Sequence, residues 1–250
     1  MNADCGESFG SWTLGGDTEL LPLLSSVNVA CGMHAGDPTV MERTVSLAKR
    51  LGVSVGAHPG YPDLQGFGRR KLQMGAEEVY ALLIYQGGAL LGFCRAAGIP
   101  LAHLKAHGAL YNAAATDLGL AEAISRATRA LDPDLILLAQ SGSAMVHAGR
   151  SLGLRVAEEA FADRAYDRHG NLVPRSQPGA VLHDPQEIVR RVLRLVQEGE
   201  VETITGECIP LTAQSICLHG DNPQALAIAQ ALRQALAEAG VAVRPLPELV

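Results

Sequence analysis

Short apolar runs alternate along this chain with segments in which apolar residues recur at helical spacing. The runs predict strands at residues 1–4, 27–31, 53–57, 101–105, 135–140, 154–158 and 215–219. The periodic segments predict helices at residues 17–24, 37–51, 77–97, 117–131, 143–152, 184–198 and 222–239. Strict alternation of strand and helix is typical of a parallel sheet with helices packed around it.

No G-x-G-x-x-G motif follows the first predicted strand, so closure into a barrel is favoured over a dinucleotide-binding fold. We therefore predict an α/β fold in which residues 1–250 form one domain, a seven-stranded parallel β/α barrel similar to the TIM barrel. Two segments break the rhythm: a long polar loop at 159–183 and a β-hairpin near 200–214. Long loops in compact domains usually carry function or meet a partner.

The composition narrows the class of protein. The chain is 48% hydrophobic and carries a net charge of −6, which supports a single large core and argues against nucleic-acid binding. Met1 leads directly into polar residues without a secretory pattern, and the apolar runs are too short to span a bilayer. The five cysteines are widely spaced and lack a C-x-x-C pair, so we expect reduced thiols in a cytoplasmic protein.

Ionisable side chains and glycines gather where the predicted strands end. In a parallel barrel these ends meet at one mouth, which is where barrel enzymes place their active sites. The candidate catalytic residues are Asp4, Glu7, His34, His58, Lys105 and His107. The candidate substrate-binding or nucleotide-binding residues are Asn28, Arg69, Arg70, Gln140, Glu158 and His219.

Residue chemistry suggests roles for some of these candidates. A lysine facing a barrel interior is costly unless it binds something, so we expect Lys105 to hold an oxyanion or phosphate. Arg69 and Arg70 follow a glycine-containing loop and suit an anionic ligand. His103 and His107 would lie about 13 Å apart along a strand, too far to share one metal ion. Motifs for a P-loop, a hydrolase elbow and a zincin are absent.

Several longer blocks, taken together, point to a known family. They are NADCGESFG, NVACGMHAGDP, HPGYPDLQGFGRR, LKAHGALYN and CLHGDNP. On these blocks the chain resembles the LamB/YcsF family over nearly its whole length. The resemblance implies a barrel related to polysaccharide deacetylases, and ATP-driven cleavage of 5-oxoproline to L-glutamate together with 5-oxoprolinase subunits B and C. Family members usually carry a few more residues before the first block, so we expect a short first strand.

The implied reaction assigns roles to the candidates. Lys105 with Arg69 would hold phosphate, while His58, Asp4 or Glu7 would activate water, and Mg²⁺ would arrive with ATP. His34 or His107 would protonate the leaving nitrogen. Two alternatives remain open: a deacetylase or amidohydrolase that binds a divalent metal through Asp4, His34 and His58, and a substrate-binding subunit that performs no chemistry. The oligomeric state and the subunit that binds ATP also remain open.

Overall fold

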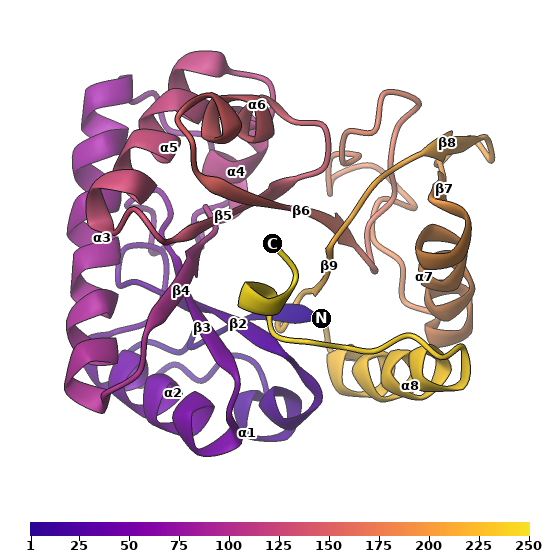
Figure 1. Ribbon diagram of the computed structural model, residues 1–250, viewed down its shortest axis with the longest axis horizontal. Coiled ribbons are helices and arrows are strands. Elements are labelled where there is room, and N and C mark those ends of the chain that lie inside the picture. The colour runs from indigo at the N-terminus through magenta and orange to yellow at the C-terminus, as the bar shows by residue number, and fades with distance from the viewer.

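The computed structural model describes residues 1–250 and contains a closed ring of parallel strands (Figure 1). The strands are β1 (Asn2–Cys5), β2 (Ser26–Ala30), β3 (Ser54–His58), β4 (Leu101–Leu104), β5 (Ile136–Gln140), β6 (Arg155–Phe161) and β9 (Ser215–Leu218). They follow one another in chain order, and β9 closes the ring by pairing with both β6 and β1. The predicted seven-stranded parallel barrel is confirmed.

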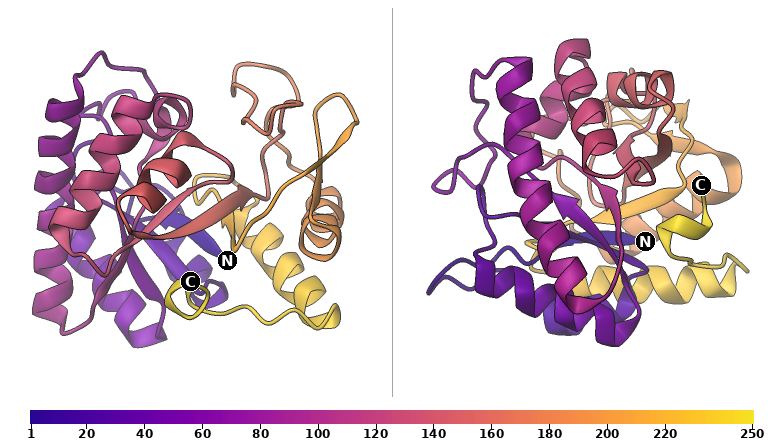
Figure 2. Two further views of the ribbon diagram at one scale, coloured as in Figure 1. Left: turned by 45° about the horizontal axis from the view of Figure 1, so that its top comes forward. Right: turned by 60° about the vertical axis from the view of Figure 1, so that its left-hand side comes forward.

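Helices cover the outside of this ring (Figures 1 and 2). They are α1 (Asp17–Leu20), α2 (Pro38–Leu51), α3 (Ala76–Ala97), α4 (Gly108–Ala114), α5 (Leu118–Leu131), α6 (Ala144–Ser151), α7 (Pro185–Glu198) and α8 (Ala225–Glu238), with 3₁₀ turns η1 (Leu21–Leu23) and η2 (Leu246–Glu248). The sequence-predicted start of α2 is explained by Asp37, whose side chain accepts from the Thr39 and Val40 amides. The helix α4 is not among the predicted ones.

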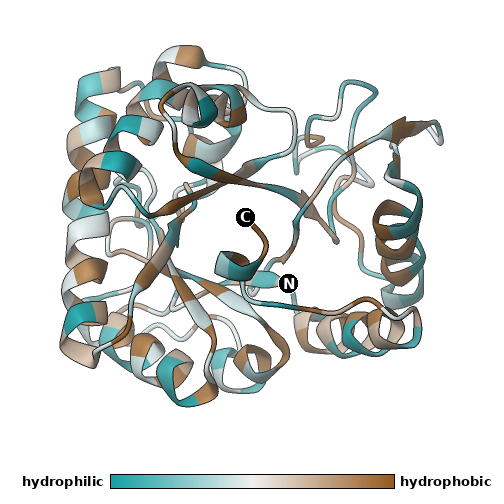
Figure 3. Cartoon of the chain, viewed as in Figure 1, coloured by the Kyte–Doolittle hydropathy of each residue, from teal (hydrophilic) through white to brown (hydrophobic).

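The longest helix, α3, meets the criteria for a membrane span by length and composition alone, contrary to the expectation that every apolar segment is too short. In the fold it behaves as a barrel helix. It packs against α5, and it buries Val79, Leu83 and Leu90. Figure 3 shows that hydrophobic and hydrophilic positions are mixed along the helices, as expected for elements with one face on a core.

The barrel strands are longer or shorter than predicted at two places that matter for the site. Strand β6 continues to Phe161, so the first residues of the predicted 159–183 loop lie within a strand. Strand β4 ends at Leu104, and His107 stands at the start of α4. Outside the barrel, β7 (Glu200–Glu202) and β8 (Cys208–Pro210) form an antiparallel pair.

The amino-terminal end of the barrel is covered by the last turn of the chain. Leu246 of η2 packs with Ile136, Leu138 and Ala157, and its amide donates to Ser26 Oγ at 3.1 Å. Figure 1 looks onto this end, where the C-terminus lies over the ring of strands. The C-terminal turn thus closes the amino-terminal end, and the larger cavity lies at the opposite, carboxyl end.

Candidate active site

A cavity of about 510 Å³ lies where the carboxyl ends of the strands meet. The predicted site residues that line it are Asp4, His58, Arg69, Lys105, His107, Gln140 and His219. A second cavity of about 360 Å³ shares Arg175 and His219 with the first. The other predicted residues, Glu7, Asn28, His34, Arg70 and Glu158, do not line either cavity.

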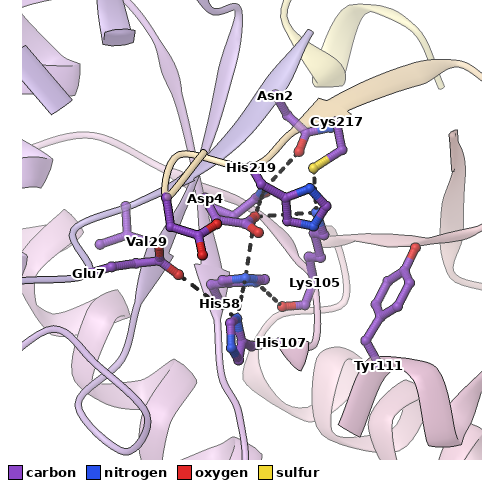
Figure 4. A network of polar contacts seen from close by, with 12 residues as sticks. Asn2, Asp4, Glu7, Val29, His58, Lys105, His107, Tyr111, Cys217 and His219 are labelled. Carbon is purple, nitrogen blue, oxygen red and sulfur yellow. Dashed lines mark hydrogen bonds and ion pairs between the residues drawn. The ribbon is translucent and has the colours of Figure 1, made fainter. Parts of the chain in front are cut away.

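A carboxylate and two imidazoles form a row at the base of the cavity (Figure 4). His58 Nε2 lies 3.3 Å from Asp4 Oδ1 and 3.0 Å from His107 Nδ1. All three side chains are buried. Burial alone would raise the pKa of Asp4, but His58 and Lys105 hold it well below its ordinary value, so Asp4 is a carboxylate.

Backbone carbonyls fix the proton positions on both imidazoles. His58 Nδ1 lies 2.9 Å from the Lys105 carbonyl, and His107 Nε2 lies 2.8 Å from the Phe67 carbonyl. A carbonyl only accepts, so each of these nitrogens must carry a hydrogen. His58 Nε2 and His107 Nδ1 therefore face each other beside Asp4, and a proton on His58 Nε2 would make that ring an imidazolium that donates toward both neighbours.

The loop that supplies the Phe67 carbonyl is under backbone constraint. Phe67 has a φ of 54°, a conformation that L-residues rarely adopt. At Gly68, with a φ of 62°, a Cβ would come within 2.8 Å of both His107 and His34. Glycine at this position thus lets the loop approach closely enough to hold His107 through its carbonyl.

Lys105 lies in the barrel interior beside Asp4, with two further partners. Its Nζ is 3.3 Å from Asp4 Oδ1, 3.2 Å from Glu159 Oε2 and 3.0 Å from Cys217 Sγ. Burial disfavours its charge, yet the carboxylates, Asp4 foremost, hold the pKa of Lys105 well above its ordinary value. Its charge is thus balanced by two carboxylates, and its role as an oxyanion or phosphate holder stays a prediction.

Glu158 is not part of the site, and its neighbour Glu159 is. Glu158 points outward to Arg150, at 2.7 Å, and to the Gly142 amide. Glu159 is fully buried in the barrel interior, where Tyr111 Oη donates to its Oε1 at 2.7 Å. Since β6 continues past residue 158, alternation of side chains along the strand sends Glu158 out and Glu159 in.

Two of the predicted binding residues, Asn28 and Gln140, form hydrogen bonds with other parts of the protein. Asn28 is buried beneath the site, where its Nδ2 donates to Asp4 Oδ1 at 2.8 Å and its Oδ1 contacts His103 Nε2 at 2.7 Å. It therefore orients Asp4 instead of meeting a ligand in the cavity. Gln140 lines the cavity, and its Nε2 donates to the Gly170 carbonyl at 3.0 Å, which connects β5 to the loop after β6.

The two adjacent arginines have different surroundings. Arg69 lines the cavity and pairs with Asp221 at 2.6 Å. Arg70 pairs with Asp63, and its side chain is 62% exposed outside the cavity. Arg70 therefore stabilises its own loop in this structure, and its contact with a ligand stays a prediction.

Glu7 and His34 form a buried cluster beside the cavity. The His34 ring stacks on the His107 ring at 3.7 Å, and both His34 nitrogens and Glu7 Oε1 lack hydrogen-bond partners. Burial, then Asp4, raises the pKa of Glu7 well above its ordinary value, and burial, then His107, lowers the pKa of His34. Burial thus favours the neutral form of both groups.

Two groups of buried side chains bring potential metal ligands together, and neither is the predicted set of Asp4, His34 and His58. Asp4, His58 and His107 form one, and Glu7, His34 and His107 form the other. Imidazole lone pairs lie in the ring plane, so the parallel rings of His34 and His107 cannot both point at one ion. The first group is the better ligand set, because backbone carbonyls already orient both of its imidazoles.

The ring of His219 is oriented by Asp163, which is not among the candidate residues. Its Nδ1 lies 2.7 Å from Asp163 Oδ1, and its ring stacks on Phe161. The carboxylate fixes the hydrogen on Nδ1 and leaves Nε2 as a proton acceptor at the cavity. The other residues missed from the sequence are Glu159, Tyr111, Cys217 and Arg175. The position of Cys217, two residues before His219, was the only sequence signal for that cysteine.

Comparisons with known proteins agree with this architecture. The family model described as the LamB/YcsF family matches residues 1–250. The 5-oxoprolinase A-subunit of Tolumonas auensis is 52% identical over 244 residues, which cover 98% of this chain and 97% of that protein. Its counterpart from Pyrococcus furiosus is 50% identical over 250 residues, covering 100% and 98%. The crystal structure of the lactam utilization protein from Thermus thermophilus superposes with a TM-score of 0.93 at 50% identity, covering 98% of each chain. The chain belongs to the LamB/YcsF family.

Proposed function

We propose that this chain is the A-subunit of a cytoplasmic, ATP-dependent 5-oxoprolinase and that its cavity binds 5-oxo-L-proline and opens the lactam to L-glutamate. The observation that carries the proposal is the row of Asp4, His58 and His107 at the base of a cavity that also contains His219. This arrangement offers a proton donor and a proton acceptor to one small ligand. The names of the relatives support the substrate class.

The two histidine environments suggest opposite roles. His219, with its Nδ1 hydrogen held by Asp163, would accept a proton from the attacking water through Nε2. His58, protonated on Nε2 beside the Asp4 carboxylate, would deliver a proton to the lactam nitrogen as the ring opens. These roles differ from those expected of His58 and His34 from the sequence, because His34 is screened from the cavity by His107.

ATP would phosphorylate the amide oxygen of the resonance-stabilised lactam and leave as ADP, and phosphate would be released after water attacks and the ring C–N bond breaks. Mg²⁺ would accompany the nucleotide. Arg69 would be the predicted cation that meets phosphate, since it lines the cavity, is paired with Asp221 alone and is partly exposed, whereas Lys105 is buried between two carboxylates and Arg70 lies outside the cavity. Subunits B and C are proposed as partners, because the names of the relatives describe one subunit of a larger enzyme.

The proposal is tested by measuring glutamate release from 5-oxo-L-proline by this chain, with and without subunits B and C and with and without MgATP. We expect release only in the complete mixture, and its loss with His58→Asn or His219→Asn. Arg168→Gln, an exposed residue outside both cavities, is the matched control. Undiminished release by both histidine variants in the complex would leave this chain with a substrate-binding role and no chemistry.

A second function is favoured by one observation: the nitrogen and oxygen atoms of Asp4, His58 and His107 lie within 4.8 Å of one another. Two imidazoles and a carboxylate form a set that suits Zn²⁺, which would supply an activated water to a metal-dependent amidohydrolase. The Lys105 ammonium, 3.3 Å from the same carboxylate, competes electrostatically with such an ion. Two results would support this function. Elemental analysis would find a divalent metal in the purified chain, and the chain would hydrolyse amides without nucleotide in a reaction that chelators inhibit.

A further inference from the structure

Arginines from two loops converge on the rim of the larger cavity. Arg69 comes from the loop after β3, and Arg164 and Arg175 come from the long loop after β6, which rises beside the barrel in Figure 2. All three line the cavity. Their charges act on one another: after burial, Arg175 is the strongest influence on the pKa of Arg164, and Arg69 is the strongest on the pKa of Arg175. The rim is therefore a concentrated positive region.

The carboxylates nearest to this region are already occupied. Asp221 pairs with Arg69 at 2.6 Å, and Asp163 is held by His219 at 2.7 Å and by Asn222 at 3.4 Å. Neither Arg164 nor Arg175 lies within ion-pair distance of a carboxylate. Asp163 and Asp221 therefore act on these arginines only from beyond ion-pair distance. Both side chains line the cavity without a directly paired carboxylate, Arg164 as a buried residue and Arg175 as an exposed one.

Arg164 is the more unusual of the two, because it is only 3% exposed. Its Nε donates to the Ala180 carbonyl at 3.3 Å and its Nη2 to the Val173 carbonyl at 2.6 Å. These bonds hold the guanidinium rigidly and leave Nη1 without a partner. Carbonyl dipoles do not neutralise a buried charge, and burial together with Arg175 lowers the pKa of Arg164 to about 10.

A buried cation that lacks an anion is costly unless a ligand supplies one. We infer that Arg164 and Arg175 form an oxyanion subsite that binds a carboxylate or phosphate group of the ligand in the larger cavity. The guanidinium fork suits either group. The inference rests on the proposed function in naming 5-oxo-L-proline as the carboxylate ligand, while a nucleotide would bring the phosphate.

Equilibrium binding to the full-length chain, measured by calorimetry without nucleotide or partner subunits, tests the subsite. The probes are 5-oxo-L-proline, its carboxamide and inorganic phosphate. We expect the acid to bind about tenfold more tightly than the amide, since a charge-assisted bond to one arginine contributes that much. Arg175→Gln should abolish this preference and leave amide binding unchanged, whereas Arg168→Gln, from the same loop, should retain it.

A second variant distinguishes anion binding by Arg164 from a purely structural role of this residue in its loop. Arg164→Lys keeps the charge but not the fork, so it should lower thermal stability through the lost carbonyl bonds and also reduce the preference for acid over amide. A purely structural arginine would lower stability while leaving that preference intact, and this result would overturn the inference for Arg164.

The remaining outcomes are also decisive. Phosphate binding that depends on Arg175, without acid preference, supports the subsite with phosphate as its ligand and removes support for the lactam assignment. Anion binding that Arg175→Gln does not change, or no binding of either anion, overturns the subsite. Turnover is not measured, so loss of the proposed activity would leave the result on anion binding standing.

Discussion

The two faces of the barrel wall differ in chemistry although their residues alternate along the same strands. The outward face packs under the helices and is built from side chains such as Val29, Leu104 and Leu137. The inward face, one residue away in each case, carries Asn28, Lys105 and Leu138, so that only part of it is apolar. Strand alternation thus lets one short segment serve both stability and chemistry.

The side chains of the inward face also change in character from the amino-terminal to the carboxyl end of the barrel. Near the amino-terminal end, Ile136 and Leu138 pack with Leu246 and contain no ionisable group. Toward the carboxyl end, Asp4 and Glu159 surround Lys105. Because all three of these side chains are buried, their ionic contacts act in a medium of lower dielectric constant than water and are stronger than at the surface.

The largest effect is expected from removing the buried cation. Lys105→Met leaves Asp4 and Glu159 uncompensated in the interior, which should cost about 3–5 kcal/mol of unfolding free energy and abolish turnover. Urea unfolding and glutamate release in the reconstituted complex measure the two effects. A stable and active variant would contradict the view that the inward face depends on this ion pair.

The outward face should respond in stability alone. Leu137→Ala opens a cavity between β5 and its helices, with an expected cost of about 2–5 kcal/mol. Turnover per folded molecule at low temperature should match that of the unmodified chain, because Leu137 lies away from the cavity. A loss of turnover larger than the loss of folded protein would show that the two faces are coupled.

Some of the features that these two variants test can be predicted from the sequence, and others depend on the closed barrel. Strand positions and the convergence of Asp4, His58 and His107 follow from apolar runs that end in glycine and ionisable residues. The partners of Lys105 do not, because β1 and β6 are remote in sequence and meet only when the barrel closes. The lack of carboxylate partners around the arginines of the long loop was equally hidden, because it is a property of the folded loop alone.

A smaller, pH-dependent effect is expected from Glu7, whose folded-state pKa is raised well above its ordinary value of 4.5 by burial and by Asp4. The folded state holds this proton more tightly than the unfolded chain, so the associated stability is complete below pH 4.5 and is lost as the pH rises through the folded-state pKa. Glu7→Gln should flatten the fall of unfolding free energy above pH 4.5.

Urea titrations at several pH values above about 5 check this expectation, with Glu122→Gln on the exposed side of α5 as control. Parallel pH curves for Glu7→Gln and the unmodified chain would mean that Glu7 is ionised in the fold.

The smallest effect is expected at Glu158, and it sharpens the comparison most. Glu158→Gln removes an ion pair with Arg150, whose side chain is 56% exposed, so the cost should be about 1 kcal/mol or less and turnover should be retained. Glu159→Gln, one residue further, removes a carboxylate from the buried charge balance of Lys105 and should impair turnover severely. Both variants make the same chemical change in adjacent positions of β6, so net charge and side-chain size are matched. Similar turnover in the two would mean that the direction in which a side chain points from the barrel wall does not decide its role.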